Sequence, residues 1–125
     1  METKKTSISL ERLKATLSTF STFGKTKNNG FTRLALSQED INTRTYFQEQ
    51  CEALGLHVTL DDLGNMYAVL PGKHPEKSPI YMGSHLDTVK KGGRFDGVLG
   101  VAAALEVITT LIEQGIEPNR PVGII

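Results

Sequence analysis

Apolar residues recur along this chain at helical spacing in some stretches, and in alternation or short runs in others. Apolar residues three or four positions apart predict an amphipathic helix over residues 8–22. Its apolar positions are Leu10, Leu13, Leu17 and Phe20. A second amphipathic helix is expected to start at Ser37, which is placed with Asp40 as a capping box, and to end at Gly55.

Short strands and a long buried helix are predicted for the rest of the chain. The expected segments are strands at residues 56–60, 66–70 and 80–83 and from Pro121, a turn at 62–65 and a helix from Gly97 to Gln114. Apolar residues nearly encircle that last helix, so we expect it to pack against a sheet. This order of elements is typical of an α/β fold, and we expect a mixed, mostly parallel sheet flanked by helices.

Composition and charge narrow the functional classes. The 125 residues suit one domain, and the 14 basic and 14 acidic side chains cancel, which disfavours nucleic acid as a partner. No apolar stretch approaches a membrane span, and the polar segment from Met1 to Ser9 lacks the character of a signal peptide. Cys51 is the single cysteine, so no internal disulfide can form and a cytoplasmic location is expected. Cys51 is interpreted as a core residue, because no activating partner is evident nearby.

Candidate chemistry is concentrated between Gly83 and Gly100. His85 and Asp87 stand two residues apart at the end of a predicted buried strand, where alternate residues share a face and a carboxylate can orient an imidazole. Asp96 directly precedes the predicted buried helix, whose first N–H groups could hold its carboxylate. Two plainer interpretations stay open: Asp96 as an ordinary helix cap, and His85 as a strand-end histidine bonded to its neighbour.

Other polar residues carry weaker signals. His57 and His74 lie outside the cluster and are interpreted as surface residues. Lys90, Lys91 and Arg94 could bind a substrate carboxylate, although a solvated loop is favoured. The glycines of this region do not form a G-x-G-x-x-G or Walker pattern, which disfavours a phosphate cradle.

Two motifs carry a resemblance to a known family. Residues 83–89 (GSHLDTV) and 92–101 (GGRFDGVLGV) resemble the amidase, hydantoinase and carbamoylase branch of the M20 metallopeptidase superfamily. Supporting stretches are residues 31–35, 37–40 and 64–65. The branch includes N-carbamoyl-L-amino-acid hydrolases, allantoate amidohydrolases and β-ureidopropionases. The resemblance extends over nearly the whole chain.

The resemblance implies a zinc-peptidase-like catalytic domain that holds two divalent metal ions, with Zn, Mn, Co and Ni as the candidates. His85 matches the first ligand of one ion, and Asp96 matches the carboxylate that bridges both. Asp87 matches the catalytic acid that clamps the His85 imidazole. The peptide bond after the bridging aspartate is often cis in the superfamily, so a cis bond is expected between Asp96 and Gly97.

The implied substrate is a small ureido or amide molecule. An N-carbamoyl-L-amino acid is the most direct candidate, and its hydrolysis would release the amino acid, ammonia and carbon dioxide. Allantoate is one alternative, and the substrate of an M20 deacylase or dipeptidase is another. The non-enzymatic alternative is an inactive, truncated remnant.

The resemblance also implies that residues 1–125 are the N-terminal part of a longer catalytic domain. The family's Glu-Glu pair, its further histidine ligands and the lid domain used for dimerisation would lie beyond Ile125. Glu106, Glu113 and Glu117 do not stand in for that pair, because they lie on or just after the last predicted helix. We therefore expect a homodimer for the whole protein, and weak metal binding without hydrolysis for residues 1–125 alone.

Overall fold

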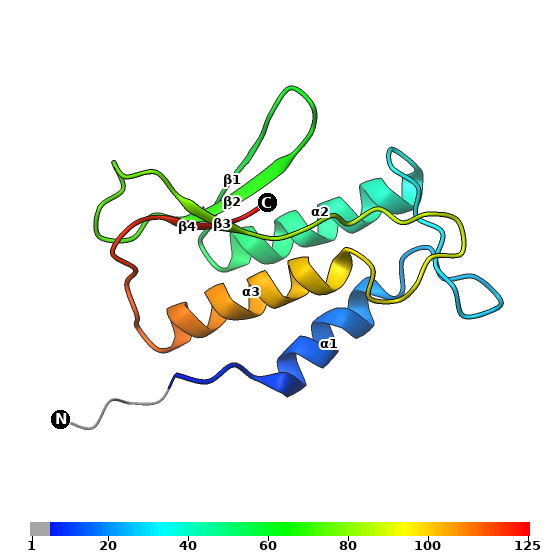
Figure 1. The fold of residues 1–125 in the computed structure, drawn as a ribbon, viewed down its shortest axis with the longest axis horizontal. Helices are drawn as coiled ribbons and strands as arrows, with labels where there is room; N and C mark the ends of the chain where they lie inside the picture. The colour runs from blue at the N-terminus through cyan, green and yellow to red at the C-terminus, as the bar shows by residue number, and fades with distance from the viewer. Residues whose placement is uncertain (1–5) are drawn as a thin grey trace.

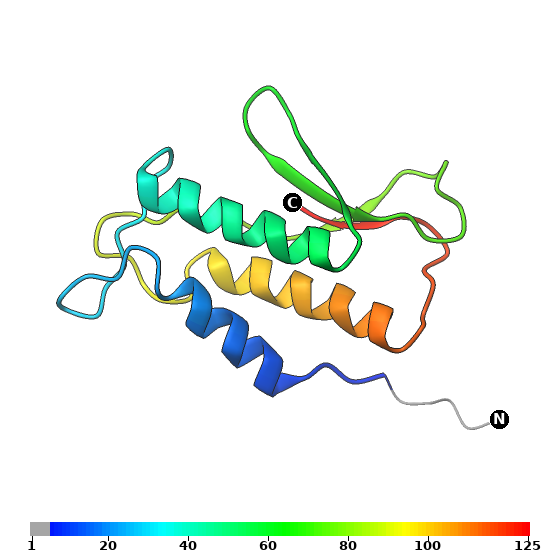
Figure 2. The ribbon, with the colours of Figure 1, turned by 180° about the vertical axis from the view of Figure 1, so that it is seen from behind.

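Three helices lie together on one side of a four-stranded sheet (Figure 1, Figure 2). This computed structural model describes residues 6–125. The helices are α1 (Leu10–Phe20), α2 (Gln38–Ala53) and α3 (Val98–Glu113). The strands are β1 (His57–Leu60), β2 (Met66–Leu70), β3 (Ile80–Met82) and β4 (Val122–Ile124). Each element predicted from the sequence is present, with ends that differ by a few residues. The expectation that the strand at 80–83 is buried is wrong, because β3 is an edge strand in which Ile80 and Tyr81 are 54% and 41% exposed.

The start of α2 has the predicted capping box, except that the Asp40 carboxylate bonds to a different backbone N–H. The Ser37 hydroxyl accepts a hydrogen bond from the Asp40 N–H at 3.3 Å, which satisfies one free donor of the first turn. The Asp40 carboxylate reaches back to the N–H of Leu36 at 2.9 Å rather than to Ser37. Both bonds hold the segment that leads into α2.

The sheet has the order β1-β2-β4-β3 and is mixed, as predicted. The expectation of a mostly parallel sheet is wrong for these strands, because only β3 and β4 pair in parallel. A short turn joins β1 to β2 and forces them to be antiparallel, whereas α3 provides the long crossover that a parallel pair requires. The helices also cover one face of the described sheet rather than both (Figure 2).

The core lies between the sheet and the helices. Ala102 and Ile108 of α3 and Ile124 of β4 are fully buried in it. The prediction that α3 is buried against a sheet is confirmed, since α3 contacts β3 and β4 on one side and α1 on the other. Cys51 is also fully buried, and burial raises the pKa of its thiol to about 12, which confirms it as a core residue.

An ion pair attaches α1 to α3. The Arg12 guanidinium donates to both carboxylate oxygens of Glu106, from Nε at 2.7 Å and from Nη2 at 2.9 Å. Arg12 Nη1 also donates to the exposed Glu113 at 2.8 Å. Burial acts to raise the Glu106 pKa, but the hydrogen bonds from Arg12, the Ser9 N–H and the Thr110 hydroxyl outweigh it and lower the pKa below its ordinary value.

Two sequence expectations concern the start of the chain and membranes. The first five residues of the polar segment from Met1 to Ser9 lie outside the described residues. Among residues 6–125, none of the helices combines the length and apolar character needed to cross a bilayer.

Candidate functional site

The candidate site begins where β3 ends. The Ile125 N–H donates to the Met82 carbonyl at 2.9 Å, and the Ser84 N–H donates to the Ile125 carbonyl at 3.1 Å. Pairing with β4 thus continues to the residue before His85. Gly100 of α3 faces Ser84 so closely that a β-carbon there would lie 2.8 Å from the Ser84 β-carbon. The first turn of α3 therefore packs directly beneath the strand end that carries His85.

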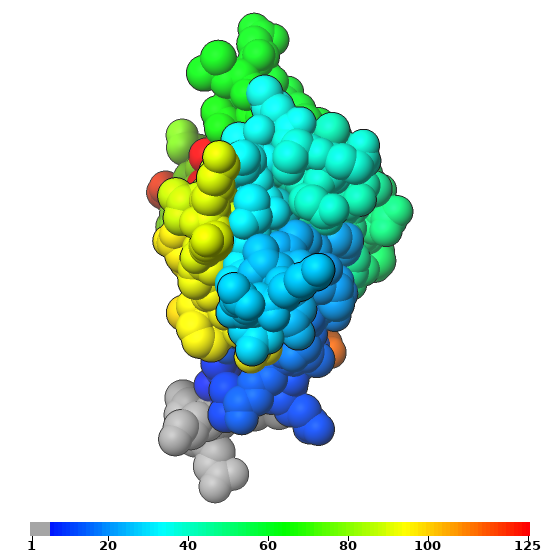
Figure 3. Space-filling view, turned by 90° about the vertical axis from the view of Figure 1, so that its right-hand side faces the viewer, coloured from blue at the N-terminus to red at the C-terminus, as the bar shows by residue number. Residues whose placement is uncertain are grey.

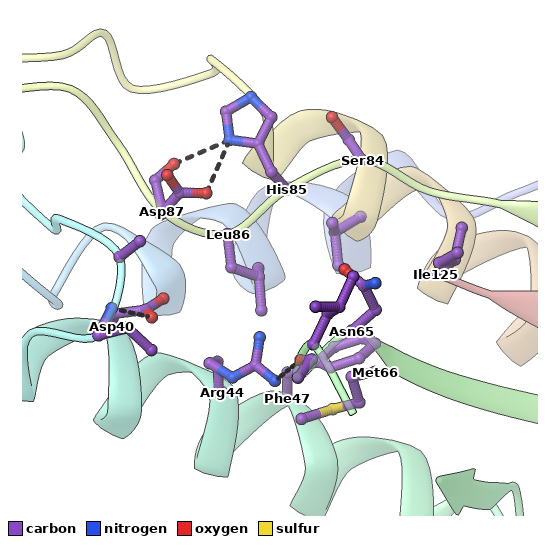
Figure 4. Close-up of a pocket in the computed structure, with 15 residues that line it drawn as sticks. Asp40, Arg44, Phe47, Asn65, Met66, Ser84, His85, Leu86, Asp87 and Ile125 are labelled. Atoms are coloured by element: carbon purple, nitrogen blue, oxygen red, sulfur yellow. Dashed lines mark hydrogen bonds and ion pairs between the residues drawn. The ribbon is translucent and has the colours of Figure 1, made fainter. Parts of the chain in front are cut away.

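The three residues singled out by the sequence lie together at this strand end. His85 Nδ1 is 2.9 Å from the backbone carbonyl of Asp87 and 3.4 Å from Asp87 Oδ1 (Figure 4). His85 Nε2 is 3.7 Å from Asp96 Oδ1. The side chains are 49%, 43% and 57% exposed for His85, Asp87 and Asp96, so the site is open to solvent.

This arrangement assigns different tasks to the two imidazole nitrogens. The backbone carbonyl oxygen and Oδ1 of Asp87 can only accept hydrogen bonds, so in a neutral His85 ring the hydrogen lies on Nδ1. The lone pair of Nε2 then points toward the Asp96 carboxylate. A histidine held in this way by a carboxylate or a carbonyl is the usual form of a metal-binding histidine.

Asp96 does not act as an ordinary helix cap. The N-cap residue of α3 is Gly97, and no side chain caps this helix. Asp96 takes part through its backbone carbonyl, which accepts from the Val98 N–H at 2.8 Å. The expectation that helix N–H groups hold the Asp96 carboxylate is therefore wrong, and that carboxylate is left facing His85.

The peptide bond between Asp96 and Gly97 is trans, and residues 6–125 contain no cis peptide bond. The expected cis bond is therefore not present. A trans bond is favoured by about 3 kcal/mol at a non-proline residue. The chain turns here through the backbone angles of Gly97 instead, with φ +72° and ψ −57°.

The donor set fits part of a divalent metal site. Two ligands on one tetrahedral ion lie roughly 3.4 Å apart, and His85 Nε2 and Asp96 Oδ1 are separated by 3.7 Å. Imidazole and carboxylate together suit zinc and related ions. Within residues 6–125 there is no group of three or more His, Cys, Asp or Glu that could share an ion, so these two donors form a partial set.

A cavity of about 430 Å³ lies on the Asp87 side of the site. Its wall includes His85 and Asp87 together with Arg44 and Asn65 from the α2 and hairpin regions (Figure 4). Arg44 donates to the Gly64 carbonyl, which fixes its guanidinium beside the turn. Asp96 is not part of this wall, so the cavity adjoins the pair of His85 and Asp87.

Arg33 is the site-region residue whose role the sequence does not reveal. It is 2% exposed, and its Nε donates to the Leu86 carbonyl at 2.6 Å. Burial lowers the pKa of the guanidinium, while the nearby charges of Asp40 and Asp87 oppose that shift. Its sequence signals are a charge beside apolar residues and a place in the 31–35 stretch that supports the resemblance, and neither predicts a partner for the side chain.

The segment around Arg33 runs beside the loop that follows His85 (Figure 3). The N–H of Phe31 donates to the Gly92 carbonyl at 3.1 Å, and the Gly92 N–H returns a bond to Phe31 at 2.7 Å. The Thr88 N–H donates to the Arg33 carbonyl at 2.7 Å. These bonds fasten the site loop to a segment more than fifty residues earlier.

The other sequence candidates lie outside the site. His57 and His74 are exposed, as predicted. Lys90 and Lys91 are exposed loop residues. Arg94 is exposed too, and it donates to the hydroxyls of Ser21, the C-cap of α1, at 3.2 Å and of Ser18 at 3.3 Å.

Comparison with known proteins adds a family context to this geometry. A model of peptidase family M28 matches residues 65–125. The chain is 37% identical over 115 residues to an N-carbamoyl-L-amino-acid amidohydrolase of Rhizobium meliloti, a match that covers 92% of the chain and 28% of the relative. It is 36% identical over 115 residues to the allantoate amidohydrolase of Escherichia coli, with the same coverage of 92% and 28%.

A solved structure shares the fold. The crystal structure of a hydantoinase/carbamoylase family amidase from Burkholderia ambifaria matches with a TM-score of 0.93 and 40% identity, covering 95% of this chain and 29% of that one. The matching family model carries the M28 name rather than M20, whereas the relatives and the solved structure match the branch that the motifs indicated. The chain spans less than a third of the length of each of these proteins.

Proposed function

We propose that this chain contributes to a metal-dependent amidohydrolase, because it is similar in sequence to an N-carbamoyl-L-amino-acid amidohydrolase and in fold to a hydantoinase/carbamoylase family amidase. The enzyme would cleave a linear C–N bond of a small ureido or amide molecule. Residues 1–125 would be the N-terminal part of its catalytic domain.

One observation carries this proposal beyond the similarity. His85 is bonded through Nδ1 to Asp87, and its Nε2 faces the Asp96 carboxylate at 3.7 Å. The carboxylate of Asp96 makes no capping bond that would occupy it. An oriented imidazole and an available carboxylate on one exposed edge are what a divalent ion requires from its first two protein ligands.

Each residue has a defined task in this proposal. His85 would be a ligand of one ion through Nε2, and Asp96 would supply the carboxylate that two ions share. Asp87 keeps the hydrogen of the imidazole on Nδ1 and so keeps Nε2 available as a ligand. When bound, divalent ions act as Lewis acids that polarise the scissile carbonyl group and activate water for attack.

The favoured substrate is an N-carbamoyl-L-amino acid. Water and the ureido group would give the free amino acid, ammonia and carbon dioxide. A second candidate is allantoate, because the identity to the Escherichia coli allantoate amidohydrolase is 36%, against 37% for the Rhizobium meliloti enzyme. A deacylase or dipeptidase activity is the third candidate, and the experiment below includes it.

Further properties of the whole protein belong to the same proposal. The resemblance supports a homodimer formed through a lid domain, and Zn, Mn, Co or Ni as the metal. A reducing, cytoplasmic compartment agrees with a single cysteine that is fully buried.

The test uses the protein expressed together with whatever sequence follows Ile125 in its gene. It would be assayed with N-carbamoyl amino acids, allantoate and N-acyl amino acids, before and after chelation and re-addition of each metal. We expect hydrolysis of a ureido substrate that is lost on chelation and absent in His85→Ala and Asp96→Ala. Hydrolysis that persists in the fully chelated protein, or in both variants, would contradict the proposal.

A further inference from the structure

Arg33 has a buried guanidinium that bonds to the backbone instead of to an acid. Its Nε donates to the Leu86 carbonyl at 2.6 Å, and its Nη1 donates to the carbonyls of Phe23 at 2.8 Å and Phe20 at 3.4 Å. No carboxylate of residues 6–125 forms an ion pair with it. The residue is 2% exposed.

Such a placement needs a reason, because removing a guanidinium from water is costly unless strong hydrogen bonds replace its hydration. Phe20 ends α1 and Phe23 follows it, so their carbonyls lie at the negative end of the helix dipole, which favours a cation. That contact explains why the charge is tolerated. It does not explain why the side chain extends to Leu86.

The Leu86 carbonyl belongs to the residue between His85 and Asp87. A second set of bonds joins Arg33 to Thr88, the residue that follows Asp87. The Arg33 N–H donates to the Thr88 hydroxyl at 2.8 Å, and the Thr88 N–H donates to the Arg33 carbonyl at 2.7 Å. Arg33 therefore holds the main chain on both sides of Asp87.

The two site side chains have little other support. His85 is 49% exposed and Asp87 is 43% exposed. The pair relies on its backbone for orientation, because His85 Nδ1 contacts the carbonyl and carboxylate of Asp87, while the rest of the ring lies against the backbone of Gly97.

We propose that Arg33 is a positioning residue that fixes the His85–Asp87 pair through its hydrogen bond to the Leu86 carbonyl. This inference rests on the proposed function, in which His85 binds a metal ion. Arg33 itself touches neither the ion nor the substrate. It acts by limiting rotation of the backbone from which both side chains project.

The planar fork of arginine is required for this task. Nε and Nη1 donate at the same time to Leu86 on one side and to the end of α1 on the other. A lysine in the same place keeps the charge but has a single nitrogen, which cannot reproduce both fixed directions. Arg33→Lys is therefore the informative variant, and Arg33→Met removes the charge as well.

In the experiment, the whole protein is freed of metal and titrated with Co²⁺, and its Co²⁺ affinity and the absorption spectrum of the Co²⁺ complex are recorded. The temperature is one at which circular dichroism shows each variant to be folded. We expect Arg33→Lys to raise the Co²⁺ dissociation constant about 10- to 100-fold, the range for groups that orient a metal ligand. We also expect an altered spectrum. Thr88→Val removes the hydroxyl that accepts from the Arg33 N–H and donates to the Phe31 carbonyl, without touching the guanidinium. It should weaken Co²⁺ binding less and provides a second test if Arg33→Lys does not fold.

Arg12→Lys is the matched control, because Arg12 also joins distant segments through several bonds but contacts Glu106 and Glu113 of α3 and not the site loop. It should lower thermal stability and leave Co²⁺ affinity unchanged. If wild-type protein binds Co²⁺ through His85 and both Arg33→Lys and Thr88→Val bind it equally well, the positioning role is wrong and the proposed function stands. If wild-type protein does not bind Co²⁺, or His85→Ala binds it unchanged, the proposed function fails and the inference fails with it.

Discussion

The imidazole of His85 packs against the backbone of Gly97, at a point where a β-carbon would overlap the ring atoms Cε1 and Nδ1. Gly97 also has φ +72°, a conformation that residues with a side chain rarely adopt. The residue after Asp96 therefore serves two purposes. It turns the chain into α3, and it leaves room for the imidazole that faces Asp96.

Gly97→Ala should displace His85 as well as strain the turn. The angles of Gly97, φ +72° and ψ −57°, are those of a γ-turn, which strains an L-residue more than the left-handed helical region does at about 1–2 kcal/mol. The overlap with the ring adds a further cost. Gly115→Ala is the matched control, because Gly115 has φ +64° but nothing within 4 Å of its added β-carbon. Urea unfolding should show a larger loss for Gly97→Ala, and Co²⁺ binding should weaken in that variant alone. Equal losses with normal Co²⁺ binding in both would contradict this account.

Local patterns predicted the elements well, because each element has its own signal. The apolar spacing of α3, the serine cap of α2 and the turn between β1 and β2 all depend on neighbouring residues. Contacts between residues that are distant in the sequence were harder to predict. Leu10 was assigned to the apolar face of α1 but is 59% exposed, because α1 packs on α3 through its later residues Leu17 and Phe20.

In the site too, contacts between neighbouring residues could be predicted and contacts between distant residues could not. His85 and Asp87 are two residues apart, so their contact could be inferred from strand geometry. The approach of Asp96 to His85 was expected from the resemblance, since a loop of this length has no fixed path. The contact of Arg33 with Leu86 spans 53 residues and depends on how two loops pack, which no local pattern specifies.

Asp87→Asn should weaken metal binding moderately. Removing a group that orients a histidine ligand usually costs 10- to 100-fold in affinity. We expect a value near 10-fold here, because the Asp87 backbone carbonyl still accepts from His85 Nδ1 at 2.9 Å. Glu76→Gln is the matched control, since Glu76 forms an equivalent pair with the exposed His74 at 3.3 Å. Titration with Co²⁺ should show no change for Glu76→Gln, and an equal change in both variants would argue against a specific role for Asp87.

Cys51 should be inert to thiol reagents in the folded protein. Its side chain is fully buried, and burial raises the thiol pKa to about 12, so the reactive thiolate is nearly absent at pH 8. Labelling with a chromogenic disulfide reagent should proceed only as fast as the protein opens, and at once in denaturant. Rapid labelling under native conditions would show that Cys51 is accessible.

The Glu106 carboxylate should make folding sensitive to acid. Its folded-state pKa lies below the ordinary value, because the bonds from Arg12, the Ser9 N–H and Thr110 outweigh the effect of burial. The stabilisation is therefore complete above the unfolded pKa of about 4.3, and it is lost as the pH falls through the lower folded-state pKa. Glu106→Gln should lower the free energy of unfolding by about 1.5–3 kcal/mol at pH 7, the usual range for hydrogen bonds to a charged group, and flatten its decline below pH 4. Glu113→Gln should change little, because Glu113 is 57% exposed although it binds the same Arg12. Urea unfolding between pH 3 and 7 tests both variants, and an unchanged acid slope in Glu106→Gln would refute the assignment.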